Sequence, residues 1–337
     1  MSSTFAAPTY LMTYPQNPAV NDYRCVVNSA GTKVIFERSP ADTSSGAKKI
    51  TNLYVIDVIG SGNKPTPFLQ GPTLPLSSDR PDWSWETGSV AYNWIPDKGL
   101  EVGTANSDGS NPTRLKHTGG MEYPTWFPDG SLAVMNTDKA ASPCPSTSQI
   151  KADGTLVASA LAGSKLWAGM PSVNRVNPNL IAFAGQTVEN PGSYNQDNNY
   201  IWVVDTSQSP VKPVPLESGV QTSSSFKPLY QARAPWWSPD GKWVVFESYR
   251  ADPPPANNGK GMYAMYLYEY GVQNGTAVQL TDPAYNMNHA KWFPFQSGGG
   301  IAPALIVAAY QPGANSGPPG WPYGIAILNV SSFMNNQ

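Results

Sequence analysis

The chain has 337 residues, with 21 basic and 23 acidic side chains and a formal net charge of −2. Charged residues make up 13% of it, about half the usual share in soluble proteins, and no cluster of Lys or Arg stands out. This balance makes nucleic acid and an anionic membrane surface poor partners. With 30 Gly and 34 Pro, the composition argues against a helical bundle and favours many short strands joined by turns.

The chain contains no run of about 18 apolar residues, so we expect no membrane insertion. Its first residues, Met1–Pro8, lack both the basic and the apolar part of a secretory signal. The low charge and the many Trp, Tyr, Asn, Ser and Thr residues nevertheless favour an extracytoplasmic location, periplasmic or secreted. Cys25 and Cys144 fit no metal or redox spacing, and one disulfide or two unpaired thiols are both open.

A short pattern recurs along the chain, in which an aromatic run ends at a tight turn and an apolar strand follows. The clearest copies are Trp236–Ser248, with Ser-Pro-Asp-Gly at its turn, and Trp126–Met135, with Phe-Pro-Asp-Gly. Pro presets φ, Asp bonds its own backbone and Gly accepts a positive φ, so both segments suit a tight turn. Weaker copies begin at Asn28–Gly31, Trp85–Gly88, Asn177–Asn179 and Lys291–Pro294.

Each copy is followed by one or two more short strand-like segments, bounded by Gly, Pro, Asn or Asp. Four strands per unit, labelled a to d outward from the centre, describe a propeller blade. We therefore predict an all-β fold, a six-bladed β-propeller of four-stranded antiparallel blades, as a single domain over residues 1–337. The predicted blades cover about residues 20–72, 78–118, 120–160, 165–218, 228–282 and 285–330. Trp126 and Trp237, just ahead of their turns, should be buried between blades.

The sixth unit is one strand short. Ala290–Phe295, Ala304–Ala309 and Ile325–Val330 supply its strands a to c, but Ser331–Gln337 is too polar and short for a strand d. A strand-like segment, Thr9–Tyr14, precedes the first blade. We expect this N-terminal strand to pair with Ile325–Val330 and close the ring, because an unpaired edge would otherwise remain.

The repeat resembles that of the TolB-type six-bladed propellers. The likeness rests on the two clear turns, on Asn106–Leu115 and on Ala277–Asp282, and it covers all six predicted blades, most strongly the third and fifth. The resemblance implies a fold rather than an activity, since TolB-like propellers serve as periplasmic binding modules, appendages of serine peptidases and polysaccharide-lyase scaffolds. The chain lacks room for TolB's separate N-terminal domain and has no Gly-x-Ser-x-Gly motif, so a peptidase role is not expected.

In such a blade the b–c and d–a loops share one face of the ring, and the a–b turns lie on the other. The a–b turns are mostly tight here, whereas five b–c loops are long: Ser39–Lys49, Asn136–Pro145, Gln186–Asn198, Tyr249–Met262 and Gln311–Tyr323. Long loops on a rigid scaffold often carry function. We therefore expect ligand binding on the b–c face, with Tyr194, Tyr249 and Trp321 as contacts; loops that only brace neighbouring blades are the alternative.

The mouth of the central channel is the second candidate site. Counting back eight residues from each turn glycine, and aligning blade six in the same way, gives Tyr23, Arg80, Glu122, Arg233 and Asn288. His289 lies next to the last of these. Converging Arg, Glu and His side chains can hold a carboxylated or hydroxyl-rich ligand by charge-assisted bonds, so Arg80, Glu122, Arg233 and His289 are our ligand-binding candidates. The alternative is that they simply line a wet channel.

Two function classes follow from this pattern. The first, which we favour, is a non-catalytic binding module that recognises a glycan or a protein on the b–c face. The second is a carbohydrate-active enzyme, a lyase or hydrolase, in which His289, Arg233 and Glu122 neutralise a carboxylate and move a proton. We expect no cofactor and no metal, because the two histidines lack ligand spacing and no phosphate-binding motif occurs. His117 should lie at the surface, and the oligomeric state stays open.

Overall fold

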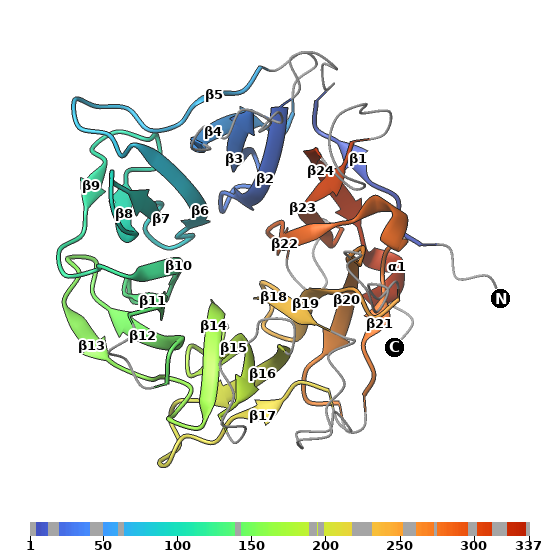
Figure 1. Ribbon diagram of the computed structural model, residues 1–337. Helices are drawn as coiled ribbons and strands as arrows, with labels where there is room; N and C mark the ends of the chain where they lie inside the picture. The colour runs from blue at the N-terminus through green and yellow to red at the C-terminus, as the bar shows by residue number, and fades with distance from the viewer. Residues whose placement is uncertain are drawn as a thin grey trace.

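The protein is a ring of six antiparallel four-stranded sheets arranged around a central axis (Figure 1). The computed structural model describes residues 5–12, 20–40, 50–59, 64–138, 143–188, 194, 199–217, 231–251, 261–272, 275–295, 302–311 and 322–334. The predicted all-β, six-bladed propeller is confirmed. No helix among the described residues is long and apolar enough to cross a membrane.

Each of the first five blades uses four consecutive strands, a to d from the axis outward. Blade 1 contains β2 (Val20–Val27), β3 (Lys33–Pro40), β4 (Asn52–Asp57) and β5 (Thr66–Pro67). Blade 2 contains β6 (Ser77–Trp83), β7 (Val90–Ile95), β8 (Glu101–Ala105) and β9 (Thr113–Arg114). Blade 3 contains β10 (Met121–Trp126), β11 (Leu132–Asn136), β12 (Ser146–Ile150) and β13 (Leu156–Ala158). Blade 4 contains β14 (Leu166–Val173), β15 (Leu180–Thr187), β16 (Tyr200–Asp205) and β17 (Val214–Pro215). Blade 5 contains β18 (Ala232–Trp237), β19 (Trp243–Ser248), β20 (Ala264–Glu269) and β21 (Val278–Gln279).

The sixth blade is assembled from both ends of the chain. Its strands a to c are β22 (Asn288–Trp292), β23 (Ala304–Tyr310) and β24 (Tyr323–Asn329), and its fourth strand is β1 (Thr9–Tyr10). Thr9 pairs with Ile327 and Tyr10 with Ala326, so the predicted closure by an N-terminal strand is confirmed for these residues. Residues 13 and 14 of the predicted segment lie outside the described part of the chain. After β24 the chain forms one helical turn, α1 (Ser331–Met334).

The a–b turns have the chemistry that their sequences predict. In blade 5 the Gly241 amide donates to Ser238 O at 2.9 Å, and Asp240 Oδ1 accepts from the Lys242 amide at 3.2 Å. Gly241 has a φ of 72°, and an added Cβ would come within 2.6 Å of Asn174 Oδ1 in blade 4. Glycine is therefore required there both for its conformation and for the close approach of two blades.

Four of the five expected b–c loops are shorter than the sequence predicts. Residues at their ends belong to strands: Ser39 to β3, Asn136 to β11, Gln186 to β15 and Tyr323 to β24. Their ladders extend toward the b–c face because the pairing between neighbouring strands continues past the apolar run: Asn21 pairs with Ser39, and Tyr310 pairs with Tyr323.

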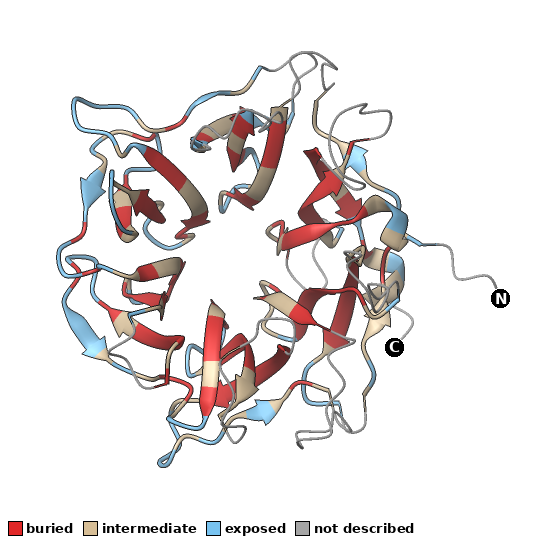
Figure 2. Ribbon diagram, in the orientation of Figure 1, coloured by how far each residue is buried: buried red, intermediate tan, exposed pale blue. Residues whose placement is uncertain are grey.

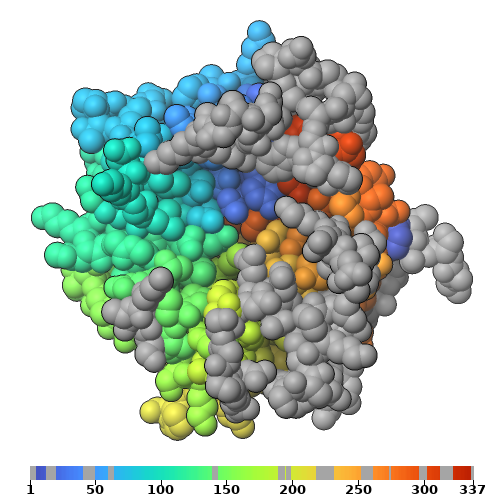
Figure 3. Space-filling model, in the orientation of Figure 1, coloured from blue at the N-terminus to red at the C-terminus, as the bar shows by residue number. Residues whose placement is uncertain are grey.

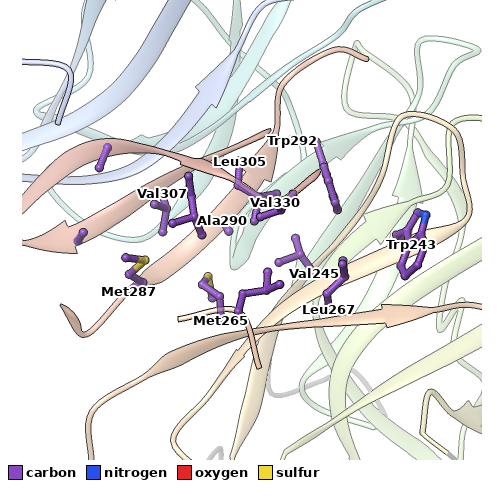
Figure 4. Close-up of a cluster of buried hydrophobic side chains, with 14 of the residues drawn as sticks. Trp243, Val245, Met265, Leu267, Met287, Ala290, Trp292, Leu305, Val307 and Val330 are labelled. Carbon is purple, nitrogen blue, oxygen red and sulfur yellow. The ribbon is translucent and has the colours of Figure 1, made fainter. Parts of the chain in front are cut away.

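The apolar core is divided into six clusters, and each cluster joins two neighbouring blades. Figure 4 shows the cluster between blades 5 and 6, where Trp243, Val245 and Leu267 meet Trp292 and Val307. As predicted, Trp126 and Trp237 are buried between blades, with 3% and 4% of their surfaces exposed. Buried residues fill the inner strands, whereas the outer strands β9 and β13 are largely exposed (Figure 2). Burial of apolar surface between blades therefore holds the ring together.

No disulfide joins the two cysteines. Cys25 is buried in β2, and burial raises the pKa of its thiol to about 12. A thiol with so high a pKa is a poor nucleophile at neutral pH.

Candidate functional site

The innermost strand of every blade carries a β-bulge. In each case the strand pairing shifts around one residue with a positive φ, between 33° and 53°. We call these six the bulge residues: Arg24, Arg80, Tyr123, Met170, Ala234 and His289. None is glycine, and non-glycine residues seldom adopt this conformation. Four of the six are followed directly by proline, which is tolerated in a strand at a bulge because no ladder hydrogen bond is lost.

The six bulge residues line one central cavity. Its wall also includes Pro81, Pro124, Thr125, Pro171, Pro235, Trp236, Ala290 and Lys291, and it encloses about 460 Å³ between protein atoms, including the part open to solvent. The repeated bulge therefore turns one side chain from each blade toward the axis. Bulges often re-aim side chains in this way next to functional sites.

Acceptors on the second strands hold three of these bulges in place. Glu37 on β3 accepts the Arg80 amide at 2.6 Å, and Asn93 on β7 accepts the Tyr123 amide at 3.1 Å. Glu247 on β19 accepts the His289 amide in the same way. In each case the acceptor belongs to the preceding blade, so one polar side chain both satisfies a buried N–H group and links two blades.

Ion pairs surround the cavity. Arg24 donates to both oxygens of Glu37 at 3.1 and 3.2 Å, and Arg80 Nη1 lies 2.7 Å from Glu122 Oε2. Arg233 pairs with the fully buried Glu247 and also donates to Asn288 Oδ1 at 3.0 Å. Burial raises the pKa of the Glu37, Glu122 and Glu247 carboxyls, and the neighbouring arginines oppose that rise.

The sequence-predicted channel residues therefore divide into two groups. Arg80 and His289 line the cavity, whereas Glu122 and Arg233 stand beside it, committed to the ion pairs just described. The predicted common repeat position holds for Glu122 and Arg233, each of which directly precedes the bulge residue of its strand. It is wrong for Arg80, which is itself the bulge residue; the counterpart in blade 2 is Asp79. The reason is that the a–b turn of blade 2 is one residue longer. The Gly88 amide donates to Ser84 O, four residues back, whereas the Gly241 amide donates to Ser238 O, three residues back. Counting eight residues back from Gly88 therefore ends one residue too late in the strand.

The predicted aromatic contacts have different surroundings. Tyr194 Oη accepts from Asn199 Nδ2 at 3.0 Å, and its ring lies 6.2 Å from Trp167, edge to face. Tyr249 is buried, with its ring 5.3 Å from that of Tyr263. Trp321 lies outside the described residues. Their role as ligand contacts stays a prediction.

Sequence reasoning missed Arg24 and Lys291, although both line the cavity. Arg24 would have emerged if the repeats had been aligned on the first residue of each turn instead of on the glycine. Lys291 precedes Trp292 in a recognised repeat copy, but nothing in that pattern separates a channel lysine from a surface one. Its ammonium donates to Pro81 O at 2.8 Å and lies 4.0 Å from the centre of the Trp236 ring. Burial lowers its pKa, which Asp82 partly offsets.

The a–b end of the channel is crossed by side chains from several blades. Arg175 in blade 4 pairs with Glu86 in the blade 2 turn at 2.9 Å, and its guanidinium lies 4.6 Å from the centre of the Trp85 ring. Trp85 Nε1 donates to Val27 O in blade 1 at 3.0 Å. Because blades 1, 2 and 4 meet at this end, we infer that the cavity opens toward the b–c face.

Aromatic side chains gather toward the b–c side of the cavity. The Tyr23 ring lies 4.9 Å from both His289 and Tyr323, and Arg233 stacks 4.3 Å over the ring of Tyr263. Burial raises the pKa of Tyr23, Tyr263 and Tyr323, so their hydroxyls are neutral. In the space-filling view, atoms of the first blade (blue) lie near the centre of this face, beside those of the last (red) (Figure 3).

Groups of three or more His, Cys, Asp and Glu side chains able to hold a metal ion do not occur in the part of the chain that the structure describes. His117 is exposed, as expected.

No protein-family model and no curated protein matches this sequence. Among solved structures, a protein described as TolB from Agrobacterium tumefaciens is similar over 78% of this chain and 80% of its own, with 16% identity and a TM-score of 0.55. An oligogalacturonate lyase in complex with manganese is similar over 97% of this chain and 94% of its own, with 11% identity and a TM-score of 0.53. The α-L-arabinofuranosidase Arb93A from Fusarium graminearum is similar over 98% and 99%, with 12% identity and a TM-score of 0.53. Such low identities carry the fold alone. The chain has the fold of a TolB-like six-bladed β-propeller.

Proposed function

We propose that this chain is a non-catalytic binding module that recognises a glycan on its b–c face, over the opening of the central cavity. The observation that carries the proposal is the group of neutral tyrosines, Tyr23, Tyr263 and Tyr323, placed beside a cavity that is crossed by side chains at its opposite end. Aromatic faces suit stacking on sugar rings. Tyr23 and Tyr263 already donate to Asn288 Oδ1 and Gln231 Oε1, which leaves their hydroxyl oxygens as acceptors for sugar hydroxyls. The composition is consistent with an extracytoplasmic site of action.

Binding is favoured over catalysis by the engagement of the catalytic candidates. Glu122 and Arg233 are held in ion pairs, and His289 projects from blade 6, on the opposite side of the ring from Glu122 in blade 3 (Figure 1). General acid–base catalysis needs both groups within hydrogen-bond reach of one ligand position. No carboxylate is among the described residues that line the cavity.

A sugar-cleaving enzyme is the second candidate. Two enzymes whose names identify sugar substrates, the lyase and the arabinofuranosidase, are similar over nearly their entire lengths. In that case His289, with its unpartnered Nε2 atom in the cavity, would be the proton carrier.

A glycan array followed by an activity screen tests both candidates. We expect binding to at least one glycan without release of reducing ends or unsaturated products from neutral and acidic polysaccharides. Tyr263→Ala should weaken the binding at least about tenfold, while Tyr285→Ala, on the short helix η2 (Pro283–Tyr285) outside the cavity lining, should not. Turnover that is lost in His289→Phe would establish the enzyme instead, and binding to a protein but to no glycan would replace the ligand class.

A further inference from the structure

The cavity wall has two chemically different halves. Blades 6, 1 and 2 contribute the polar bulge residues His289, Arg24 and Arg80, together with Lys291. Blades 3, 4 and 5 contribute Tyr123, Met170 and Ala234, with prolines and the Trp236 ring. The cations therefore face an apolar and aromatic surface: the Arg80 guanidinium lies 4.2 Å from the centre of the Tyr123 ring and the Lys291 ammonium 4.0 Å from that of Trp236.

Three polar atoms of the polar half have no hydrogen-bond partner among the described residues. They are Arg24 Nε, Arg80 Nε and His289 Nε2, each shielded from solvent. His289 is 7% exposed, and its backbone amide is already held by Glu247. A buried donor without a partner costs about 1–3 kcal/mol, so three such atoms on one cavity wall call for an explanation. A ligand that accepts hydrogen bonds would satisfy them.

The two arginines are held close to each other by their partners. Their guanidinium carbons lie 5.9 Å (Arg24) and 4.2 Å (Arg80) from the centre of the same ring, that of Tyr123. Arg24 is anchored through Nη1 to Glu37, and Arg80 through Nη1 to Glu122. Arg80 Nη1 also lies 3.6 Å from Asp79 Oδ1, so both guanidiniums are engaged through Nη1, while their Nε atoms have no partner among the described residues.

Four cations lie near His289, and each is paired with a carboxylate: Arg24 with Glu37, Arg80 with Glu122, Arg233 with Glu247 and Lys291 with Asp82. Burial lowers the pKa of His289 well below its usual range, and the charges of Arg24, Arg233, Arg80 and Lys291 lower it further. The cations that oppose a proton on His289 attract a negative charge placed at the same position. In a site of low dielectric such attraction is stronger than in water.

We propose that the central cavity binds one carboxylate group, with Arg24 Nε, Arg80 Nε and His289 Nε2 as donors and with the apolar part of the ligand against Tyr123, Met170 and Trp236. A planar carboxylate matches guanidinium donors better than a spherical anion does. The opposite apolar half favours an acid with an organic body over an inorganic ion. This inference goes beyond glycan recognition and does not require it, since the carboxylate can belong to a small organic acid or to an acidic sugar.

The test uses phenylacetate and its neutral isostere phenylacetamide as probes, with titration calorimetry on the full chain. We expect phenylacetate to bind and phenylacetamide to bind at least about tenfold more weakly. Arg80→Lys keeps a cation for Glu122 but removes the Nε donor, and His289→Phe keeps a ring against Tyr23 but removes Nε2. Each should weaken phenylacetate at least about tenfold. The matched control is Arg114→Lys, in the exposed pair with Glu101 on the outer strands, which should change nothing.

His289→Phe also protects the test against misfolding. It removes an unpartnered buried nitrogen, so we expect its melting temperature to be unchanged or raised. Equal affinity for the acid and the amide, or unchanged affinity in both variants, would overturn the proposal. Tighter binding of inorganic phosphate than of phenylacetate would also overturn the proposal, because it would identify the cavity as a site for inorganic oxyanions.

A further arm separates this inference from the glycan proposal. D-glucuronate is compared with D-glucose, and a preference for the acid that disappears in Arg80→Lys supports the site and identifies a sugar acid as the source of the carboxylate. Phenylacetate binding without any glycan binding keeps the carboxylate site and removes the glycan proposal. Glycan binding that is insensitive to Arg80→Lys, with no phenylacetate binding, keeps the glycan proposal and removes the carboxylate site.

Discussion

The interfaces between blades and the wall of the central cavity follow opposite rules, although the same strands build both. At the interfaces, strand residues such as Trp237 and Val245 are buried in apolar clusters with regular pairing around them. A few residues before Trp237 in β18, and at the equivalent place in every innermost strand, the pairing is broken by a bulge, and arginines, carboxylates and an imidazole are buried nearby. Apolar contacts give stability at low cost, whereas a strained backbone and unpartnered donors reduce it.

This difference indicates where the protein gives up stability for another purpose. Irregular geometry in one strand could be accidental, but it recurs at the equivalent position in all six. Substitutions at the interfaces should therefore change stability alone, and substitutions on the cavity wall that leave its ion pairs intact should change binding with small effects on stability. The predictions below test that separation.

The largest expected effect is at the interfaces. Trp126→Ala and Trp237→Ala should each lower the free energy of unfolding by about 3–5 kcal/mol, because each opens a large cavity between two blades. Urea denaturation measures the loss, and ligand binding by the remaining folded protein should be unchanged. Val157→Ala, at a half-exposed site on the outer strand β13, is the control and should stay within about 0.5 kcal/mol. Lost binding with retained stability would mean that these tryptophans contact a ligand.

Arg233 stands at the border between the two regions. Because Glu247 is fully buried, Arg233→Ala leaves an uncompensated charge, and we expect a loss of about 3–4 kcal/mol. If Arg233 instead held a carboxylated ligand, as the sequence predicts, the substitution would weaken binding and leave stability unchanged. The double variant Arg233→Ala with Glu247→Ala should recover much of the loss, and the coupling from a double-mutant cycle gives its size. If Arg233→Ala unfolds at the same urea concentration as the unmodified protein, the pair is not structural.

The closure of the ring is an interface formed by very few residues. Removal of residues 1–12 deletes β1 and exposes the edge of β24, so we expect the melting temperature to fall by about 3–8 °C. Removal of residues 1–5 leaves β1 intact, together with the hydrogen bond that the Ala6 amide donates to Leu280 O, and serves as the control. Equal melting curves for the two deletions would show that β1 does not stabilise the ring.

The smallest effect concerns the protonation of His289. Its pKa is well below the usual 6.5 in the folded protein, so the unfolded chain binds a proton that the folded chain does not. Stability should therefore fall as the pH drops below about 6.5, and His289→Phe should remove about 1–2 kcal/mol of that loss between pH 6.5 and 5. His117→Phe, at an exposed site, is the control. The same pH dependence in both variants would contradict the assignment.

The fold was predictable because its signals are local. Ser238 to Gly241 form their turn through contacts within five residues, and each further strand is bounded by similar turn residues. Even the closing strand followed from counting, since the sixth unit lacked one. What the local signals missed are the strand ends toward the b–c face, at Ser39, Asn136, Gln186 and Tyr323, where pairing extends beyond the apolar run.

The site was only partly predictable because its contacts are not local. Arg80 and His289 were found, but one extra residue in the turn before Gly88 hid the equivalence of Arg80 with Arg24. Glu37 and Glu247 gave no signal at all, since each acts on an amide of the next blade, 43 and 42 residues away. A single sequence does not show which strand carboxylate faces which neighbouring backbone.

Because of the bulges, the residue types on the cavity wall can differ without a change in the backbone of the blades. Arg, Tyr, Met, Ala and His all occupy the same backbone conformation here, and none of the six positions holds a β-branched residue. A side chain at such a position lines the cavity, and none of the six belongs to the buried part of an apolar cluster, although Met170 also packs against the cluster between blades 4 and 5. The bulge positions without an ion pair are thus open to change on one rigid frame, whereas Arg24 and Arg80 are held by Glu37 and Glu122. A small library at Tyr123, Met170 and Ala234 would convert the apolar half of the wall to other specificities and leave the carboxylate donors in place.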